Sequence, residues 1–262
     1  MDLIDINGVG LEVRRLSPQG AATAQAPIVF LHEGLGSAAM WMAGENPWPE
    51  AVCEATGRQG IVYSRRGYGQ SGAVPDVRGA GRLPPDYMQR EAWEVLPALL
   101  QALHVSKPVL LGHSDGGTIA LLHASRHEVA ACIVMAPHVM VEDISIRSIE
   151  QARDAYENGN LRQRLARYHA DVDGAFWQWN DAWLSPGFRS FDIREDCRRI
   201  TAPVMAIQGL DDIYGTMAQI EQIAPTRGPF AMHKLAQCGH SPQRDQPELT
   251  TRLVRDFLAA QN

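Results

Sequence analysis

Short apolar segments alternate with segments of helical periodicity along most of this chain of 262 residues. The apolar segments lie at residues 27–32, 60–64, 107–112, 129–137, 202–209 and 230–235. Helical patterns cover residues 88–103, 118–125 and 248–260. Continuously apolar strands are typical of a parallel sheet that is buried on both faces, and their alternation with helices indicates βαβ units. The predicted fold class is therefore α/β.

Two further segments complete the predicted architecture. Asn7-Gly8 lies between two short runs of alternating residues, which predicts a β-hairpin and brings the expected number of strands to eight. Residues 138–199 have helical periodicity and no convincing strand, and they are too few to bury a strong core alone. We therefore expect a core domain of residues 1–137 and 200–262, with a helical cap of residues 138–199 inserted after the sixth strand.

Charge and cysteine content argue against several classes of protein. The formal net charge of −6 gives no electrostatic basis for binding nucleic acid. The four cysteines are far apart and form no Cys-x-x-Cys pair, so we expect neither a metal site nor a redox motif. No apolar run is long enough to span a membrane, and residues 1–13 lack the pattern of a secretory signal. We expect a cytoplasmic protein with free thiols and no membrane partner.

The segment Gly112-His113-Ser114-Asp115-Gly116 stands where an apolar run ends and a helical pattern begins. Gly-x-Ser-x-Gly arises by chance in roughly one protein of this length in ten, so the context must carry the inference. A strand before the motif and a helix after it are typical of a sharp turn that exposes a nucleophilic serine. The two glycines let the strand and helix backbones approach each other. The alternative is a glycine-rich connection in which the serine only caps the helix.

A nucleophilic serine needs a histidine as base and a carboxylate that orients it. In this kind of fold the three follow in the order serine, acid, histidine. His240 lies in the loop after the last predicted strand, and Asp211 and Asp212 lie in the loop after the preceding one. Both loops are at the carboxyl edge of the sheet, where open α/β sheets carry their sites. The residues alone leave the choice between the two aspartates open.

Backbone N–H groups must also stabilise the negative charge that develops during acyl transfer. The N–H of Asp115 is one expected donor, and the glycine-bearing turn within residues 30–37 is expected to hold the other. The predicted substrate pocket is lined by Glu33, Trp41, His113, Trp179 and Trp183. For the tryptophans the alternative is that they pack the cap or the core and do not touch substrate.

The chain resembles the α/β-hydrolases of the ester-hydrolase and C–C-hydrolase branch. The motifs that carry this resemblance are LHEGLGS, YSRRGYGQSG, GHSDGG, GLDD and CGHSP, in the order of the family and over nearly the whole chain. The resemblance implies a mostly parallel eight-stranded sheet flanked by helices, Asp212 as the triad acid, and Gly34 as the second oxyanion donor. Glu33 departs from the glycine of many relatives, and Asp115 replaces an apolar or aromatic residue.

The predicted function is hydrolysis of a carboxylic ester with a small to medium apolar acyl or aryl group, through an acyl-enzyme on Ser114. A thioesterase or a C–C bond hydrolase with the same triad is the first alternative, and a non-catalytic small-molecule-binding protein of this fold is the second. The resemblance also implies that dehalogenation and epoxide opening are disfavoured, because those relatives carry aspartate at this position. We expect no cofactor and no metal; the partner is the small-molecule ester, and a homodimer is left open.

Overall fold

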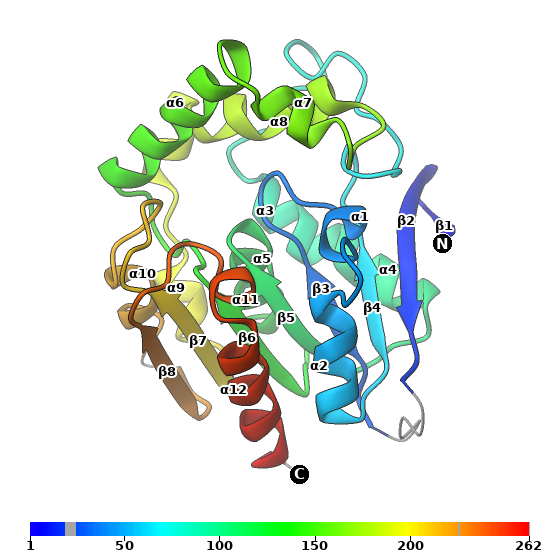
Figure 1. The fold of residues 1–262 in the computed structure, drawn as a ribbon, viewed down its shortest axis with the longest axis vertical. Helices are drawn as coiled ribbons and strands as arrows, with labels where there is room; N and C mark the ends of the chain where they lie inside the picture. Colours follow the sequence, from blue (N-terminus) through cyan, green and yellow to red (C-terminus); the bar gives the residue numbers. More distant parts are fainter. Residues whose placement is uncertain (19–24, 225, 262) are drawn as a thin grey trace.

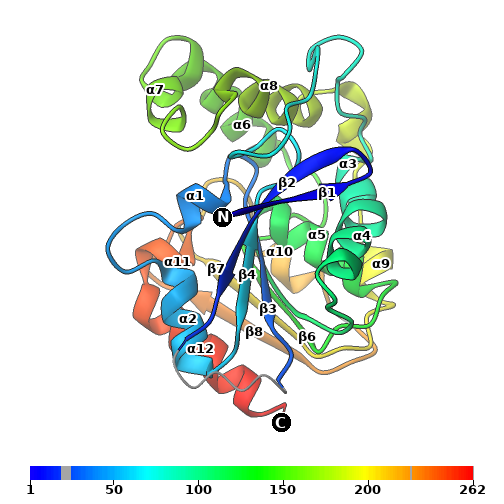
Figure 2. The ribbon, with the colours of Figure 1, turned by 90° about the vertical axis from the view of Figure 1, so that its right-hand side faces the viewer.

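The computed structural model describes residues 1–18, 25–224 and 226–261. Its strands form one sheet with the order β1-β2-β4-β3-β5-β6-β7-β8 (Figures 1 and 2). The strands are β1 (Asp2–Ile6), β2 (Val9–Leu16), β3 (Ile28–Leu31), β4 (Gly60–Tyr63), β5 (Val109–His113), β6 (Ala131–Met135), β7 (Val204–Gly209) and β8 (Phe230–Leu235). The β1–β2 and β2–β4 pairs are antiparallel, and every other pair is parallel. The predicted α/β fold with a mostly parallel, eight-stranded sheet is confirmed.

Helices cover both faces of this sheet and the carboxyl ends of its strands (Figures 1 and 2). They are α1 (Ala38–Trp41), α2 (Trp48–Thr56), α3 (Tyr87–Arg90), α4 (Leu96–Ala102), α5 (Asp115–Ala124), α6 (Asp143–Glu157), α7 (Leu161–Leu165), α8 (Val172–Trp183), α9 (Arg194–Cys197), α10 (Ala218–Glu221), α11 (Pro242–Asp245) and α12 (Pro247–Ala259). A π-helical segment, η1 (Glu91–Val95), joins α3 to α4, and a 3₁₀ segment, η2 (Pro186–Ser190), follows α8.

The central strands are apolar throughout because both of their faces are buried. Every residue of β3, β4, β5, β6 and β7 is buried. One hydrophobic core packs α4 and α5 on one face, and a second packs α2 and α12 on the other (Figure 2). This arrangement brings the carboxyl ends of the parallel strands to one edge, where the loops after β3, β5, β7 and β8 meet.

The chain leaves the sheet after β6 and returns to it at β7. Between these strands, α6, α7 and α8 form a layer over the carboxyl ends of the strands (Figure 1); we call these three helices the helical layer. The loop before α3 reaches this layer, since Arg78 and Arg82 form ion pairs with Asp181 of α8. The cap boundaries at 138 and 199 stay a prediction, and within them α9 contacts α5 of the core.

Candidate active site

Ser114 occupies the turn between β5 and α5. Its backbone has φ 53° and ψ −121°, a left-handed conformation that is uncommon for residues other than glycine. A Cβ at Gly112 would lie 2.6 Å from the backbone nitrogen of Gly117, and one at Gly116 would lie 2.5 Å from the carbonyl carbon of Leu31. Both glycines are therefore required where strand and helix backbones meet. The strained turn directs Ser114 to the edge of a cavity.

His240 and Asp212 form a pair on the same edge of the sheet. Nδ1 of the imidazole lies 2.9 and 3.0 Å from the two carboxylate oxygens. Asp212 also accepts hydrogen bonds from the Tyr214 N–H at 2.8 Å and from Gln208 Nε2 at 3.0 Å. Burial alone would raise the pKa of Asp212, but the hydrogen bonds and the charge of His240 lower it below its usual value. Asp211, the alternative acid, is exposed and only its N–H reaches the neighbouring loop, at Cys238.

A cavity of about 480 Å³ lies between this edge and the helical layer. Ser114 and His240 both line it, together with four residues predicted for the pocket: Glu33, His113, Trp179 and Trp183. The fifth, Trp41, does not line it, and the structure corrects this prediction. Its ring packs edge-on against Phe30 and Trp48, and its indole N–H donates to Glu33 at 2.6 Å.

The turn after β3 brings Gly34 to the same cavity as Asp115. Arg65 holds this turn, because its guanidinium donates to the carbonyl oxygens of His32 at 2.5 Å and Glu33 at 3.1 Å. A Cβ at Gly34 would lie 2.5 Å from Cδ1 of Trp179, so only glycine leaves room for the indole. The two predicted oxyanion donors therefore lie at one cavity, and Arg65 of the YSRRGYGQSG motif holds the turn that carries Gly34.

The side chain of Asp115 is buried and links the serine turn to other elements. It accepts hydrogen bonds from the Tyr87 hydroxyl at 2.6 Å and from the Trp183 indole at 3.3 Å. Burial raises the pKa of this carboxyl, although the charge of Arg65 opposes the shift. Because Trp183 belongs to α8, the bond joins the helical layer to the turn. No sequence pattern pointed to Tyr87, which precedes the serine by many residues.

Glu33, the departure from the family pattern, is part of a network below His240. It accepts from Trp41 and, at 3.2 Å, from Arg244, and it lies 3.5 Å from Nδ1 of His113. Burial alone would raise its pKa, but His113, Arg244 and Trp41 together lower it well below the usual range. Nε2 of His113 lies 2.7 Å from the carbonyl oxygen of His240. The network thus supports the loop that carries the imidazole.

His138 predicts a pH dependence of stability. Burial, and then the neighbouring His240, lower its pKa to about 3. Between about pH 6.5 and 3 the unfolded chain therefore holds a proton at this position that the folded chain lacks. The free energy of unfolding is expected to fall as the pH drops through this window, by up to about 1.4 kcal/mol per pH unit from this residue. Urea unfolding from pH 7.5 to 5 should show a shallower decline in His138→Gln, and equal slopes would contradict the prediction.

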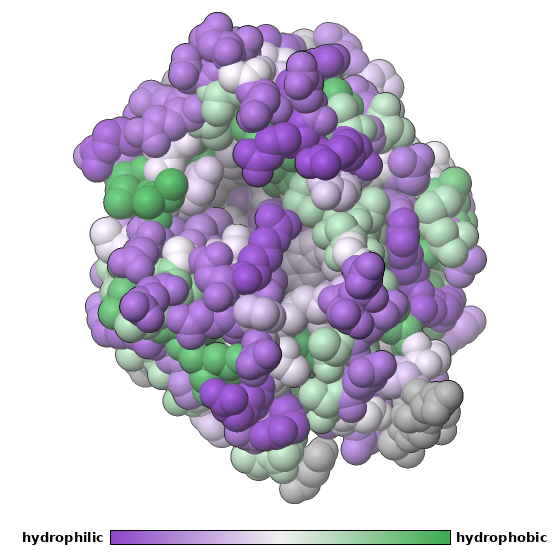
Figure 3. Space-filling model, viewed as in Figure 1, coloured by the Kyte–Doolittle hydropathy of each residue, from purple (hydrophilic) through white to green (hydrophobic). Residues whose placement is uncertain are grey.

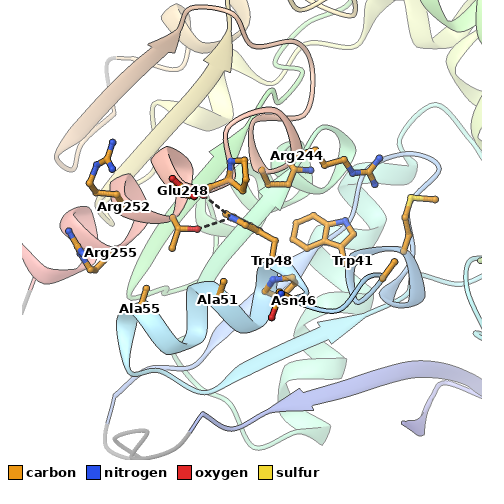
Figure 4. A pocket seen from close by; sticks show the side chains of 15 residues that line it. Trp41, Asn46, Trp48, Ala51, Ala55, Arg244, Glu248, Arg252 and Arg255 are labelled. Atoms are coloured by element: carbon orange, nitrogen blue, oxygen red, sulfur yellow. Dashed lines mark hydrogen bonds between the residues drawn. The ribbon is translucent and has the colours of Figure 1, made fainter.

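A second cavity, of about 670 Å³, lies beside the first between α2 and α12 (Figure 4). Trp41 and Trp48 form part of its wall, and Trp48 donates to the Thr251 hydroxyl at 2.9 Å. Arg244 lines both cavities. Neither Ser114 nor His240 lines the second cavity, so its larger volume carries no catalytic implication.

Metal-binding clusters and membrane-spanning helices are both absent from the part of the chain that the structure describes. Residues 1–18, 25–224 and 226–261 contain no group of three or more histidine, cysteine or acidic side chains arranged to hold a metal ion. Over the same ranges, none of the helices has the length and hydrophobicity needed to cross a bilayer.

Known proteins share this sequence pattern and fold. The 2-hydroxy-6-oxo-2,4-heptadienoate hydrolase of Pseudomonas putida is 27% identical over 203 residues, which cover 66% of this chain and 71% of that protein. The enol-lactonase of Burkholderia xenovorans has a similar structure, with a TM-score of 0.71 and 19% identity over 98% of this chain and 99% of that one. The thermophilic esterase of Thermogutta terrifontis gives a TM-score of 0.72 with 18% identity over 99% and 97%. Residues 28–253 match the profile of the alpha/beta hydrolase family, and the chain belongs to that family.

Proposed function

We propose that the protein is a serine hydrolase that cleaves carboxylic esters through an acyl-enzyme on Ser114. The observation that carries the proposal is the His240–Asp212 pair at the wall of the cavity that Ser114 also lines. An imidazole that binds a carboxylate through Nδ1 keeps Nε2 available for the serine proton. The strained turn at Ser114 presents its hydroxyl to that cavity, which supports its role as nucleophile.

The proposed reaction has two halves. In the first, His240 takes the proton of Ser114 as Oγ attacks the ester carbonyl, and Asp212 stabilises the imidazolium that forms. The N–H groups of Gly34 and Asp115 stabilise the oxyanion, and His240 then protonates the leaving alkoxide. In the second half, water gives a proton to His240 and attacks the acyl carbonyl, and the proton returns to Ser114 as the acid leaves.

The cavity supports a substrate of small to medium size. Its volume is about 480 Å³, and the apolar and aromatic side chains of Ile149, Leu165, Trp179 and Trp183 contribute to its wall. Such walls suit an acyl or aryl group. Cleavage of a C–C bond is a second candidate, favoured by the relative that hydrolyses 2-hydroxy-6-oxo-2,4-heptadienoate. A thioester would use the same acyl-enzyme.

Labelling with a fluorophosphonate probe tests the proposed nucleophile. We expect one adduct, mapped by peptide mass spectrometry to Ser114, and its loss in His240→Ala, because the imidazole activates the hydroxyl. Ser241 lines the same cavity, so Ser241→Ala is a matched control that should still be labelled. Unlabelled wild-type protein would instead favour a non-catalytic binding protein. A panel of 4-nitrophenyl esters, acyl-CoA thioesters and vinylogous diketones then distinguishes ester, thioester and C–C hydrolysis by kcat/KM.

A further inference from the structure

Arginine side chains gather at the cavity that Ser114 lines. Arg164 of α7, Arg167 just after α7 and Arg244 of α11 all contribute to its wall. Arg164 and Arg167 are exposed, and Figure 3 shows hydrophilic side chains around the hollow beneath the helical layer. The protein as a whole carries a formal net charge of −6, so a cationic opening does not follow from its composition. The position of these charges therefore requires a local explanation.

The three arginines differ in their partners. Arg244 donates to Glu33 at 3.2 Å, which neutralises it within the network below His240. Nε of Arg167 donates a hydrogen bond to the carbonyl oxygen of Arg164 at 3.4 Å, and Cζ of Arg167 lies 5.7 Å from the centre of the Tyr168 ring. Among the carboxylates of residues 1–18, 25–224 and 226–261, none pairs with either Arg164 or Arg167.

Another arginine of α7, Arg162, has a carboxylate partner and serves as a comparison. Arg162 donates to Asp173 through Nε at 2.9 Å and Nη2 at 2.7 Å, and it does not line the cavity. Arg162 of α7 is therefore paired with an acidic residue and does not line the cavity. Arg164 of α7 and Arg167 just after it line the cavity and have no carboxylate partner. Their two positive charges are available to a ligand.

The carboxylates at the cavity do not neutralise these charges. Glu33 is held by Trp41 and Arg244, and Asp115 is buried under Tyr87 and Trp183. Neither of these carboxylates forms an ion pair with Arg164 or Arg167. The two guanidinium groups therefore leave unpaired positive charge at the cavity, and such charge attracts anions from solution.

The wall beneath the arginines is apolar. Leu161 and Leu165 of α7 line the cavity together with Arg164, and Ile149 and Trp179 belong to the same lining. Arginine stems commonly lie along such apolar surfaces while the guanidinium stays in water. A ligand that matches this lining has an apolar body and a negatively charged end.

We propose that Arg164 and Arg167 form a subsite for an anionic oxygen group, a carboxylate or a phosphate, at the end of the substrate remote from the scissile bond. Guanidinium groups bind both kinds of oxyanion through charge-assisted hydrogen bonds. The inference rests on the proposed function, since it specifies the substrate class of the same site. The proposed substrate is an anionic ester that binds in this cavity with its charged group beneath α7 and its carbonyl group at Ser114.

Paired esters that differ in one charge test the subsite. We expect kcat/KM for 4-nitrophenyl hemiadipate to exceed that for 4-nitrophenyl methyl adipate by about tenfold or more, because a charge-assisted hydrogen bond has about that effect. The Arg164→Gln, Arg167→Gln double variant should reduce this ratio to about one. Arg162→Gln is the matched control, since it removes an arginine of α7 outside the cavity and should keep the ratio. The ratio should also fall as salt rises from 20 to 500 mM.

Further pairs of substrates identify the kind of anionic group that is preferred and whether it belongs to the acyl group or to the leaving group. 4-Nitrophenyl 5-phosphonopentanoate replaces the carboxylate by a phosphonate, and 4-acetoxybenzoate against its methyl ester moves the charge to the leaving group. A ratio of about one in every arm, or a preference that survives the double variant, overturns the inference while the esterase activity stands. If no ester is hydrolysed, the proposed function fails. A thermal-shift titration with adipate and with inorganic phosphate then decides the subsite: a shift lost in the double variant supports it, and no shift overturns it.

Discussion

Replacing Ser114 with alanine is expected to lower kcat for ester hydrolysis about 10⁴-fold or more, with the free energy of unfolding changed by less than about 1 kcal/mol. The hydroxyl of Ser114 is the proposed nucleophile, and His240, the proposed base, lines the same cavity. The backbone N–H of residue 114 donates to Met135 at 2.8 Å, and alanine keeps this bond. Steady-state kinetics with 4-nitrophenyl butyrate and urea unfolding measure the two quantities.

Three further variants test this prediction. His240→Ala should lose a similar factor, and the Ser114→Ala, His240→Ala double variant should lose little more, because residues that act as one unit are not additive. Ser241→Ala, which removes the second serine hydroxyl of the cavity, should retain most of the activity. If Ser114→Ala kept more than about a tenth of kcat, or if the losses multiplied in the double variant, the proposed nucleophile would be wrong.

Replacing Gly116 with alanine is expected to destabilise the fold by more than about 3 kcal/mol. The new Cβ would lie 2.5 Å from the carbonyl carbon of Leu31 and 2.6 Å from the carbonyl oxygen of His32. These are backbone atoms at the end of β3, which cannot move without shifting the strand against its neighbours. Overpacking a core commonly costs about 1–3 kcal/mol even where side chains can adjust, so a backbone clash should exceed that range. Urea unfolding at pH 7.5 measures the loss.

The next residue provides the matched control. A Cβ at Gly117 would lie 3.2 Å from both the carbonyl oxygen of Gly112 and Cβ of Pro137, close contacts that small movements relieve. Alanine also stabilises a helix interior by about 1 kcal/mol relative to glycine. We expect the free energy of unfolding of Gly117→Ala to stay within about 1 kcal/mol of the wild type. A similar loss of unfolding free energy in both variants would show that the turn at Ser114 does not depend on the close approach of α5 to β3.

Much of the fold could be predicted from short segments. The apolar run before Gly112 and the helical pattern after Ser114 predicted β5 and α5, and both are present, although α5 begins three residues earlier than expected (118 − 115). The loops of Ser114, Asp212 and His240 could be expected to meet, since parallel strands deliver their loops to the same edge. These inferences hold because hydrophobic periodicity and glycine geometry are constraints between neighbouring residues.

The candidate site could not be predicted fully from residues that are neighbours in the sequence. Asp211 and Asp212 are equivalent in spacing terms, and the loop conformation decides that the second carboxylate meets His240 while the first stays exposed. The prediction that Trp41 lines the cavity was wrong because its ring packs against Phe30 and Trp48. An aromatic residue near a turn suits a core and a pocket equally.

The sequence by itself determined the class of fold, the glycine-bounded turn at Ser114 and the loops that carry the proposed acid and base. Only the tertiary structure decided that Arg65 holds the turn of Gly34, that Asp115 is bound by Trp183, and that Arg164 opens onto the cavity. The physical reason is the distance along the chain over which each feature is set. Local backbone conformation and the pattern of apolar residues involve residues close in the chain. A site depends on side chains that the sheet and the helical layer bring together from distant segments.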